Sequence, residues 1–321
     1  MKFLGLFRKY GVFIILLVLI IAFTIINPVF FSINNAINLS KQIAIMGILS
    51  VGMTFVLLTG GIELSMGSVV SMLCVTVSMY VTKLGIPAPV AMLMGIITAT
   101  LVGLINGVLI AKIKVPPLIM TLGMQIFLSG FTYTLCGGLP VYGIPASLKY
   151  LAQTSVLGVI PLSALIMLIV LLIGGFILSK TYFGRYLYAV GSNEEATSLS
   201  GINADKIRIL AYTFCGTIVG IAGIVMLARV GSGQPSAGDS YEMDVLTACV
   251  LGGVSLNGGK GNLGKAFVGI LIIGILSNGM SIAGLGDFQQ RMVKGLVLIF
   301  AVVLDSLQYV KVRKKVREIA K

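Results

Sequence analysis

The sequence predicts an all-α integral membrane protein, and two observations lead to this fold class. Of the 321 residues, 57% are hydrophobic and only 10% are charged, and the mean hydropathy is +1.07. A soluble domain carries about 25% charged residues, so this chain lacks the polar side chains that would cover a water-facing surface. The apolar residues also form runs close to the ~20 residues that a helix needs to cross a bilayer. We therefore exclude a soluble protein with a large core.

We expect about ten transmembrane helices in a single domain that occupies residues 1–321. The eighth run is short and rich in glycine, so we expect a broken or re-entrant helix there. Such backbone is tolerated in a membrane where it is buried in protein or lines a cavity. The ten runs are approximately residues 10–27, 42–60, 66–82, 88–111, 116–136, 157–179, 208–228, 243–257, 264–284 and 292–310.

The distribution of Lys and Arg predicts that both termini lie in the cytoplasm. With the N-terminus inside and ten alternating spans, 17 of the 23 basic residues fall in cytoplasmic segments and 6 fall outside. This excess follows the positive-inside rule, whereas an odd number of spans would place the basic tail outside. The topology explains the net charge of +13, and we expect no nucleic acid as a partner.

The long polar interval at residues 180–208 is predicted to be a cytoplasmic loop that contains one short helix. Ser192 and Glu195 have the spacing of a capping box, in which each side chain accepts a hydrogen bond from a free backbone N–H at the start of the helix. Gly201 is suited to the left-handed conformation that ends such a helix. A helix of about two turns is marginal in water by itself, so we expect it to pack against something else.

Two glycine-rich breaks share the pattern G-G-h-x-L-x-x-G, where h is aliphatic, at residues 60–67 and 252–259. In transporters, internal repeats often bring broken helices together at the substrate site. The alternative is a chance match, since the chain contains 40 glycines and small residues also serve close helix packing.

Several kinds of chemistry have no residues to support them. The chain has no histidine, and its four cysteines lie in apolar runs without a C-x-x-C pair, so we expect no metal site. Charges are missing from the middle of the runs, which argues against proton coupling. Residues 258–261 read Gly-Gly-Lys-Gly and lack the Ser or Thr that a phosphate loop requires. Three acidic residues cluster around the start of the eighth run, and we expect them at the outer surface: Asp239, Glu242 and Asp244.

These absences predict a transport subunit that is not an enzyme and binds no cofactor itself, because a separate ATPase uses the ATP. The alternative function is that of a self-sufficient secondary carrier. Backbone carbonyls at broken helices can hold sodium, so ion coupling needs no charge within a span. Dependence of uptake on an ATPase would distinguish the two functions.

Four stretches resemble the permease subunits of bacterial ATP-binding-cassette sugar importers, in the branch for ribose, galactose and autoinducer-2. The likeness is strongest to the ribose permeases, and with the joining spans it covers most of the chain from about Asn34 to Asp305. The stretches are GMTFVLLTGGIELSMGSVVSM (52–72), PPLIMTLGMQIFLSG (116–130), FGRYLYAVGSNEEATSLSGI (183–202) and VLGGVSLNGGKGNLGKAFVGILIIGIL (250–276).

The resemblance implies a multi-pass protein of the bacterial inner membrane with three protein partners. These are a cytoplasmic ATP-binding-cassette ATPase, an extracytoplasmic sugar-binding protein, and a second permease copy or a paralogue. Glu195, Ala196 and Gly201 match the E-A-A-x-x-x-G coupling motif, with Thr197 in place of its second alanine, so the short helix is expected to dock on the ATPase. The expected coupling residues are Ser192, Asn193, Glu194, Glu195, Ala196, Thr197, Leu199 and Gly201.

We further expect the two breaks and part of the fifth run to line or shape the translocation pathway. Glu63 keeps the acidic character of the Asp that family members usually carry there. The alternative is that the glycines only permit packing and that Glu63 only caps the helix that follows. The expected pathway residues are Gly60, Gly61, Glu63, Leu64, Ser65, Gly67, Thr121, Leu122, Gly123, Gly252, Gly253 and Asn257.

Overall fold

The computed structural model describes residues 2–156 and 160–319, and it describes the side chains of residues 13–156, 160–303 and 306. Every predicted run contains an α-helix, although residues 157–159 of the sixth run lie outside the described residues. These helices are α1 (Lys2–Ile26), α2 (Ile33–Leu58), α3 (Met66–Thr82), α4 (Ala88–Lys112), α5 (Pro117–Cys136), α7 (Leu162–Lys180), α10 (Ala204–Val230), α11 (Tyr241–Leu251), α12 (Leu263–Ile282) and α13 (Asp287–Ile319).

Shorter elements connect these helices. Residues Ser155–Val156 (β1) and Ile160–Pro161 (β2) pair as an antiparallel hairpin, in which Val156 lies opposite Ile160. The remaining elements are the 3-10 helix η1 (Pro28–Phe31) and the helices α6 (Ala146–Gln153), α8 (Tyr182–Ser192) and α9 (Glu194–Leu199).

Among the residues whose side chains the structure describes, six helices are long and apolar enough to cross a membrane: α2, α4, α5, α7, α10 and α12. Of the most apolar stretch of each helix, 89% is buried in α2 and 67% in α10, against 17% in α5 and 22% in α7. Helices α2 and α10 therefore form the core of the bundle. Helices α5 and α7 present most of their apolar side chains to the surroundings, as helices in contact with lipid do.

Helices α4 and α10 pack closely because glycines remove the side chains between them. A Cβ atom on Gly216 would lie 2.5 Å from the carbonyl oxygen of Ala99. Gly103 on α4 similarly leaves no room for a Cβ beside the carbonyl oxygen of Tyr212. This contact fixes α10 against α4 and thereby positions Tyr212 and Asn106, which both donate hydrogen bonds to residues 62–63.

The eighth run forms a helix too short to cross a membrane. Helix α11 has 11 residues, which is about 16 Å at 1.5 Å per residue, against roughly 30 Å of bilayer hydrocarbon. Residues 231–240 before it are non-helical and lie beside α3, where the Gly238 N–H donates to Ser71 Oγ at 2.9 Å. A non-helical segment that packs on α3 and a short helix thus replace one continuous helix.

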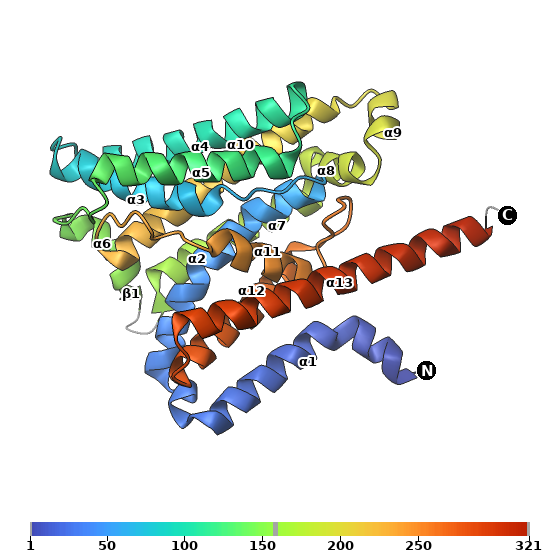
Figure 1. Ribbon diagram of the computed structural model, residues 1–321, viewed down its shortest axis with the longest axis horizontal. Helices are drawn as coiled ribbons and strands as arrows, with labels where there is room; N and C mark the ends of the chain where they lie inside the picture. The colour runs from blue at the N-terminus through green and yellow to red at the C-terminus, as the bar shows by residue number, and fades with distance from the viewer. Residues whose placement is uncertain (1, 157–159, 320–321) are drawn as a thin grey trace.

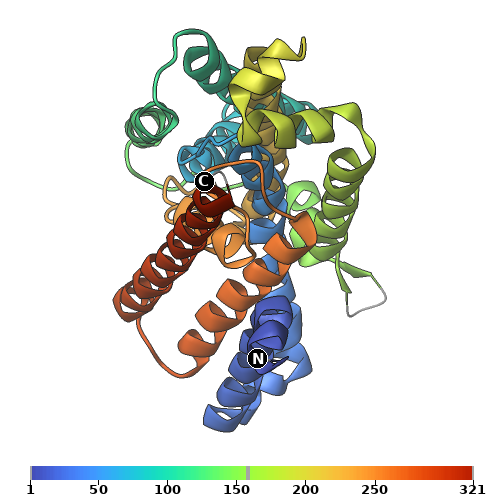
Figure 2. The ribbon, with the colours of Figure 1, turned by 90° about the vertical axis from the view of Figure 1, so that its right-hand side faces the viewer.

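The two chain ends and helices α8 and α9 lie at the same end of the bundle (Figure 1, right), while α6 and the β-hairpin lie at the opposite end. Figure 2 looks onto the first of these ends and shows both termini and α9 toward the viewer. The predicted topology requires this arrangement of the termini and residues 180–208.

Candidate functional site

The polar interval folds as two helices, α8 and α9, with Asn193 between them. Asn193 Oδ1 accepts a hydrogen bond from the Ala196 N–H at 2.9 Å and so caps α9. The predicted capping box of Ser192 and Glu195 is therefore wrong, because α8 continues through Ser192 and the Asn193 side chain already supplies the cap. In the described part of the chain, no hydrogen bond involves the Glu195 carboxylate.

Helix α9 ends before Gly201, which adopts the left-handed conformation predicted for it. Gly201 has a φ of +82°, in the left-handed region that glycine adopts without steric cost. The Gly201 N–H donates to the Ser198 carbonyl at 3.0 Å, and the Ile202 N–H donates to the Thr197 carbonyl at 3.3 Å. These bonds satisfy carbonyl groups that the end of the helix would otherwise leave free.

One face of α9 is tied to its own chain. Arg208 Nη2 lies 2.7 Å from Glu194 Oε2, and Lys114 Nζ lies 3.7 Å from Glu194 Oε1. The hydrogen bond from Arg208 holds the pKa of Glu194 below its usual value. Glu194 therefore anchors α9 to α10 and to the α4–α5 connection.

The other face of α9 is free in this chain. Leu199 is 84% exposed, and Glu195, one turn earlier, is exposed as well. Residues four apart lie on the same side of a helix. Together they present an apolar side chain and a carboxylate away from the bundle.

The end of α8 contacts both glycine-rich breaks. The Gly259 N–H donates to the Leu58 carbonyl oxygen at 3.0 Å, which joins the second break to the end of α2. A Cβ atom on Gly191 of α8 would overlap that same carbonyl oxygen and lie 2.5 Å from Gly259 N. Gly60 lies in the same junction, since a Cβ atom on it would be 3.7 Å from the Asn257 carbonyl oxygen. The two breaks thus lie side by side, next to α8.

The first break holds a buried carboxylate. Glu63 is 3% exposed, and its Oε1 accepts hydrogen bonds from the Ser65 N–H at 2.8 Å and from the Ser65 hydroxyl, just before the first residue of α3. Asn106 Nδ2 on α4 donates to Glu63 Oε2 at 2.9 Å. The preceding carbonyl, that of Ile62, accepts hydrogen bonds from Tyr212 and Thr121. This network connects the break to α4, α5 and α10, and Leu64 is buried within it.

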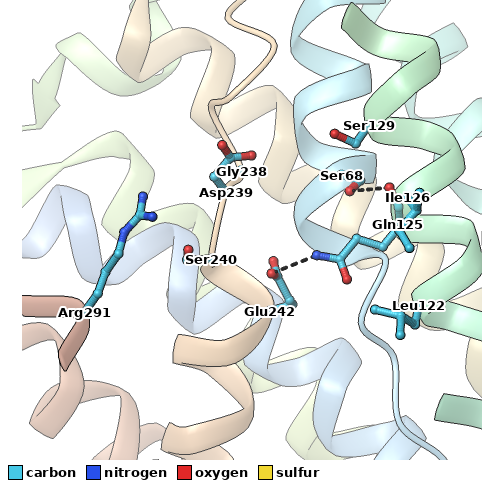
Figure 3. A pocket seen from close by; sticks show the side chains of 10 residues that line it. All are labelled: Ser68, Leu122, Gln125, Ile126, Ser129, Gly238, Asp239, Ser240, Glu242 and Arg291. Atoms are coloured by element: carbon cyan, nitrogen blue, oxygen red, sulfur yellow. Dashed lines mark hydrogen bonds between the residues drawn. The ribbon is translucent and has the colours of Figure 1, made fainter. Parts of the chain in front are cut away.

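A cavity of about 420 Å³ lies among α3, α5, α11 and α13 (Figure 3). Gln125 Nε2 on α5 donates to Glu242 Oε1 on α11 at 3.0 Å across it. The lining residues are Ser68, Leu122, Gln125, Ile126, Ser129, Gly238, Asp239, Ser240, Glu242 and Arg291.

The predicted pathway residues do not all lie in one site. Some lie at the cavity, some at the junction with α8, some in the network around Glu63, and some elsewhere. Leu122 lines the cavity, and Gly67 lies directly against the Glu242 carboxylate. Gly123 has no atom near the place where a Cβ would stand, so it faces away from the protein. In the second break, Gly252 packs on Ala266 of α12, away from the cavity, and Gly253 has a φ of +82°. Gly60 and Asn257 lie at the junction with α8. Gly61 lies against Tyr212, beside the buried network that contains Glu63, Ser65 and Thr121.

The expected outer-surface position is wrong for Glu242, which is 5% exposed. Residues 231–240 pack on α3, and this places Glu242, which follows them in the chain, inside the bundle. Asp244 is also largely covered and pairs with Lys294 at 2.6 Å. Sequence reasoning also missed Asn106 and Gln125, although an amide in an otherwise apolar run was the signal that would have found both.

We expect Asn106→Leu to destabilise the protein by about 1–3 kcal/mol, since it leaves Glu63 Oε2 buried without its donor. The melting temperature of the purified protein in detergent measures this loss. The same change in a Glu63→Leu background should cost less, because the two residues interact. Equal losses in both backgrounds would contradict the role of this bond.

A partly open polar cavity within a bundle of apolar helices indicates the class of membrane transport proteins. The chain matches the family model described as "Branched-chain amino acid transport system / permease component" over residues 35–302, and it belongs to this family. Its family and the six apolar helices of its described part make it a multi-pass protein of the inner membrane.

Individual members of the family that resemble this chain are named as sugar permeases. The chain is 39% identical to the ribose import permease protein of Bacillus subtilis (strain 168), with 94% of each chain covered. It is 41% identical to the ribose import permease protein of Escherichia coli (strain K12), with 91% of this chain and 92% of that protein covered. The xylose transport system permease protein of Escherichia coli (strain K12) is 33% identical, with 86% of each chain covered. No solved structure matches the chain.

Proposed function

We propose that this chain is the membrane-spanning permease of an ATP-driven importer and that it carries a monosaccharide, with ribose as the first substrate to test. The free face of α9 supports this function most directly. Six residues make a helix that is marginal alone, and they leave Leu199 and Glu195 uncovered. A groove on an ATPase subunit would cover them. The substrate class is supported by the relatives named as ribose and xylose permeases.

The proposed topology has ten spans with both termini in the cytoplasm. Support comes from a helix in every predicted run, from the shared end of the termini and α9, and from the excess of Lys and Arg on the same side. Helix α11 is the re-entrant half of the eighth span in this topology.

The proposed assembly contains two permease chains, either identical or paralogous, two cytoplasmic ATPase domains and an extracytoplasmic sugar-binding protein. ATP binds to the partner subunit, and this chain binds no cofactor. Lys114, Arg208 and Glu194 would set the angle at which α9 meets the ATPase, because they fix the helix to the ends of two long helices.

Reconstitution with the cognate ATPase and binding protein tests this function. Proteoliposomes should take up labelled ribose when ATP and the binding protein are supplied on their respective sides. Uptake should stop when the ATPase carries a change that abolishes hydrolysis. Uptake that persists without the ATPase and follows an ion gradient would contradict the proposal.

A further inference from the structure

We propose that the cavity between α5 and α11 binds a neutral polyhydroxylated ligand in transit, with Glu242 and Gln125 as its principal hydrogen-bonding groups. This site deepens the proposed function and rests on it, since the ligand would be the imported sugar. Nothing in the sequence pattern of the breaks includes these two residues.

The first argument is an incomplete set of hydrogen bonds around a buried carboxylate. Glu242 is 5% exposed and donates nothing when ionised, so its two oxygens need donors. Oε1 has the Gln125 amide at 3.0 Å, whereas Oε2 is buried without a partner in the described part of the chain. Gln125 Oε1 is likewise buried and unpartnered. Because an unpaired buried polar atom is costly, this pair is suited to a ligand that supplies hydroxyl donors.

The second argument is that the backbone around Glu242 leaves room for its carboxylate, because Gly67 has no side chain. A Cβ atom on Gly67 would overlap both Glu242 Oε2 and the Gly238 carbonyl oxygen. Ser240, the residue before α11, has a φ of +69°, an unusual value for a residue other than glycine. Together these features end the non-helical segment 231–240 inside the protein and start α11 at the cavity wall. In transporters, the ends of such discontinuous helices form substrate sites.

The third argument concerns the chemistry of the lining. Hydroxyl groups, one amide, two carboxylates and one guanidinium are present, together with the apolar side chains of Leu122 and Ile126. Hydroxyls and amides both donate and accept, as the hydroxyls of a sugar require, and the two apolar side chains can contact its C–H face. The two carboxylates against one guanidinium disfavour an anion, and Arg291 disfavours a simple cation. The volume of about 420 Å³ lies within the ~300–1,000 Å³ of small-molecule pockets.

Glu242→Gln and Gln125→Leu test the site in proteoliposomes that contain the cognate ATPase and binding protein. We expect ribose uptake to fall at least about tenfold in each, the loss that corresponds to one hydrogen bond to a charged group. ATP hydrolysis stimulated by the loaded binding protein should stay within about twofold of the unmodified chain, because neither residue contacts α8 or α9. We also expect the preference for ribose over 2-deoxyribose to weaken, since fewer partners remain for the hydroxyl groups.

Asp244→Asn is the matched control. It makes the same acid-to-amide change two residues along α11, where the carboxylate pairs with Lys294 and does not line this cavity. Its uptake should keep the ribose preference of the unmodified chain. If Glu242→Gln fails to reach the membrane, the uptake and ribose preference of Gln125→Leu test the site, since this variant leaves the Glu242 carboxylate in place.

Two results would overturn the site while leaving the proposed function standing. In one, the unmodified chain imports ribose and both variants import it equally well with the same preference. In the other, uptake and ATP hydrolysis fall together by the same factor, which would assign the residues to coupling or folding. If the unmodified chain imports no monosaccharide at all, the proposed function fails and the site as a sugar site fails with it.

Discussion

Gly191→Ala is expected to abolish transport and to lower the melting temperature of the permease markedly. The new Cβ atom would overlap the Leu58 carbonyl oxygen and lie 2.5 Å from Gly259 N, and both are backbone atoms that no rotamer change can move. Overpacking of this kind costs about 1–3 kcal/mol, and relief would require α8 to separate from the two breaks. Uptake in proteoliposomes and thermal unfolding in detergent measure the two effects.

Gly175→Ala is the matched control for this prediction. Gly175 also lies inside a helix, α7, but nothing stands within 4 Å of the place for its Cβ atom. Alanine favours a helix over glycine by about 1 kcal/mol, so this variant should be as stable as the unmodified chain or more so. If Gly191→Ala behaved like Gly175→Ala, the close contact of α8 with the breaks would be refuted.

Leu199→Asp is expected to uncouple the permease from its ATPase. Leu199 is 84% exposed, so the change should leave the fold and the amount of protein in the membrane unaltered. Burial of a charge in an apolar groove is unfavourable, so ATPase co-purification should be lost and uptake should fall at least about tenfold. Glu195→Lys, one turn earlier on the same face, should act in the same direction. Co-purification with the ATPase and uptake are the two measurements.

Leu139→Asp provides the comparison for Leu199→Asp. Leu139 is a leucine at a similar exposure, 72%, in the connection that follows α5. It lies at the far end of α5 from the α4–α5 connection that contacts α9, so ATPase co-purification should be unchanged. Normal coupling in Leu199→Asp would place the docking surface somewhere other than α9.

The sequence was sufficient to predict a helix in each apolar run, because the length of an apolar run is a local property of the chain. It also placed the stop at Gly201, where only the backbone conformation matters. It failed at Ser192 because two adjacent residues could both cap a helix, and the choice depended on how far α8 extends. It failed at Glu242 because the burial of a carboxylate depends on the path of residues 231–240 beside α3, which is a tertiary property.

The candidate site shows the same division between local and long-range information. The pattern shared by the breaks drew attention to Glu63, but its donor Asn106 comes from a helix 43 residues away in the chain. Gln125 and Glu242 are separated by 117 residues, and neither belongs to a repeated pattern. Pairs of this kind become visible only when the helices are packed.

The short eighth segment has a consequence for how the protein is made in the cell. At about 16 Å, α11 is too short to be inserted as an independent span, and the backbone of residues 231–240 cannot face lipid. Gly238 finds its hydrogen-bond partner on α3, so this segment can settle only after α3 and α10 are in place. Residues 231–251 should therefore enter a bundle in which α3 and α10 are already in place, and the cavity should be complete only after α13, which supplies Arg291, has followed.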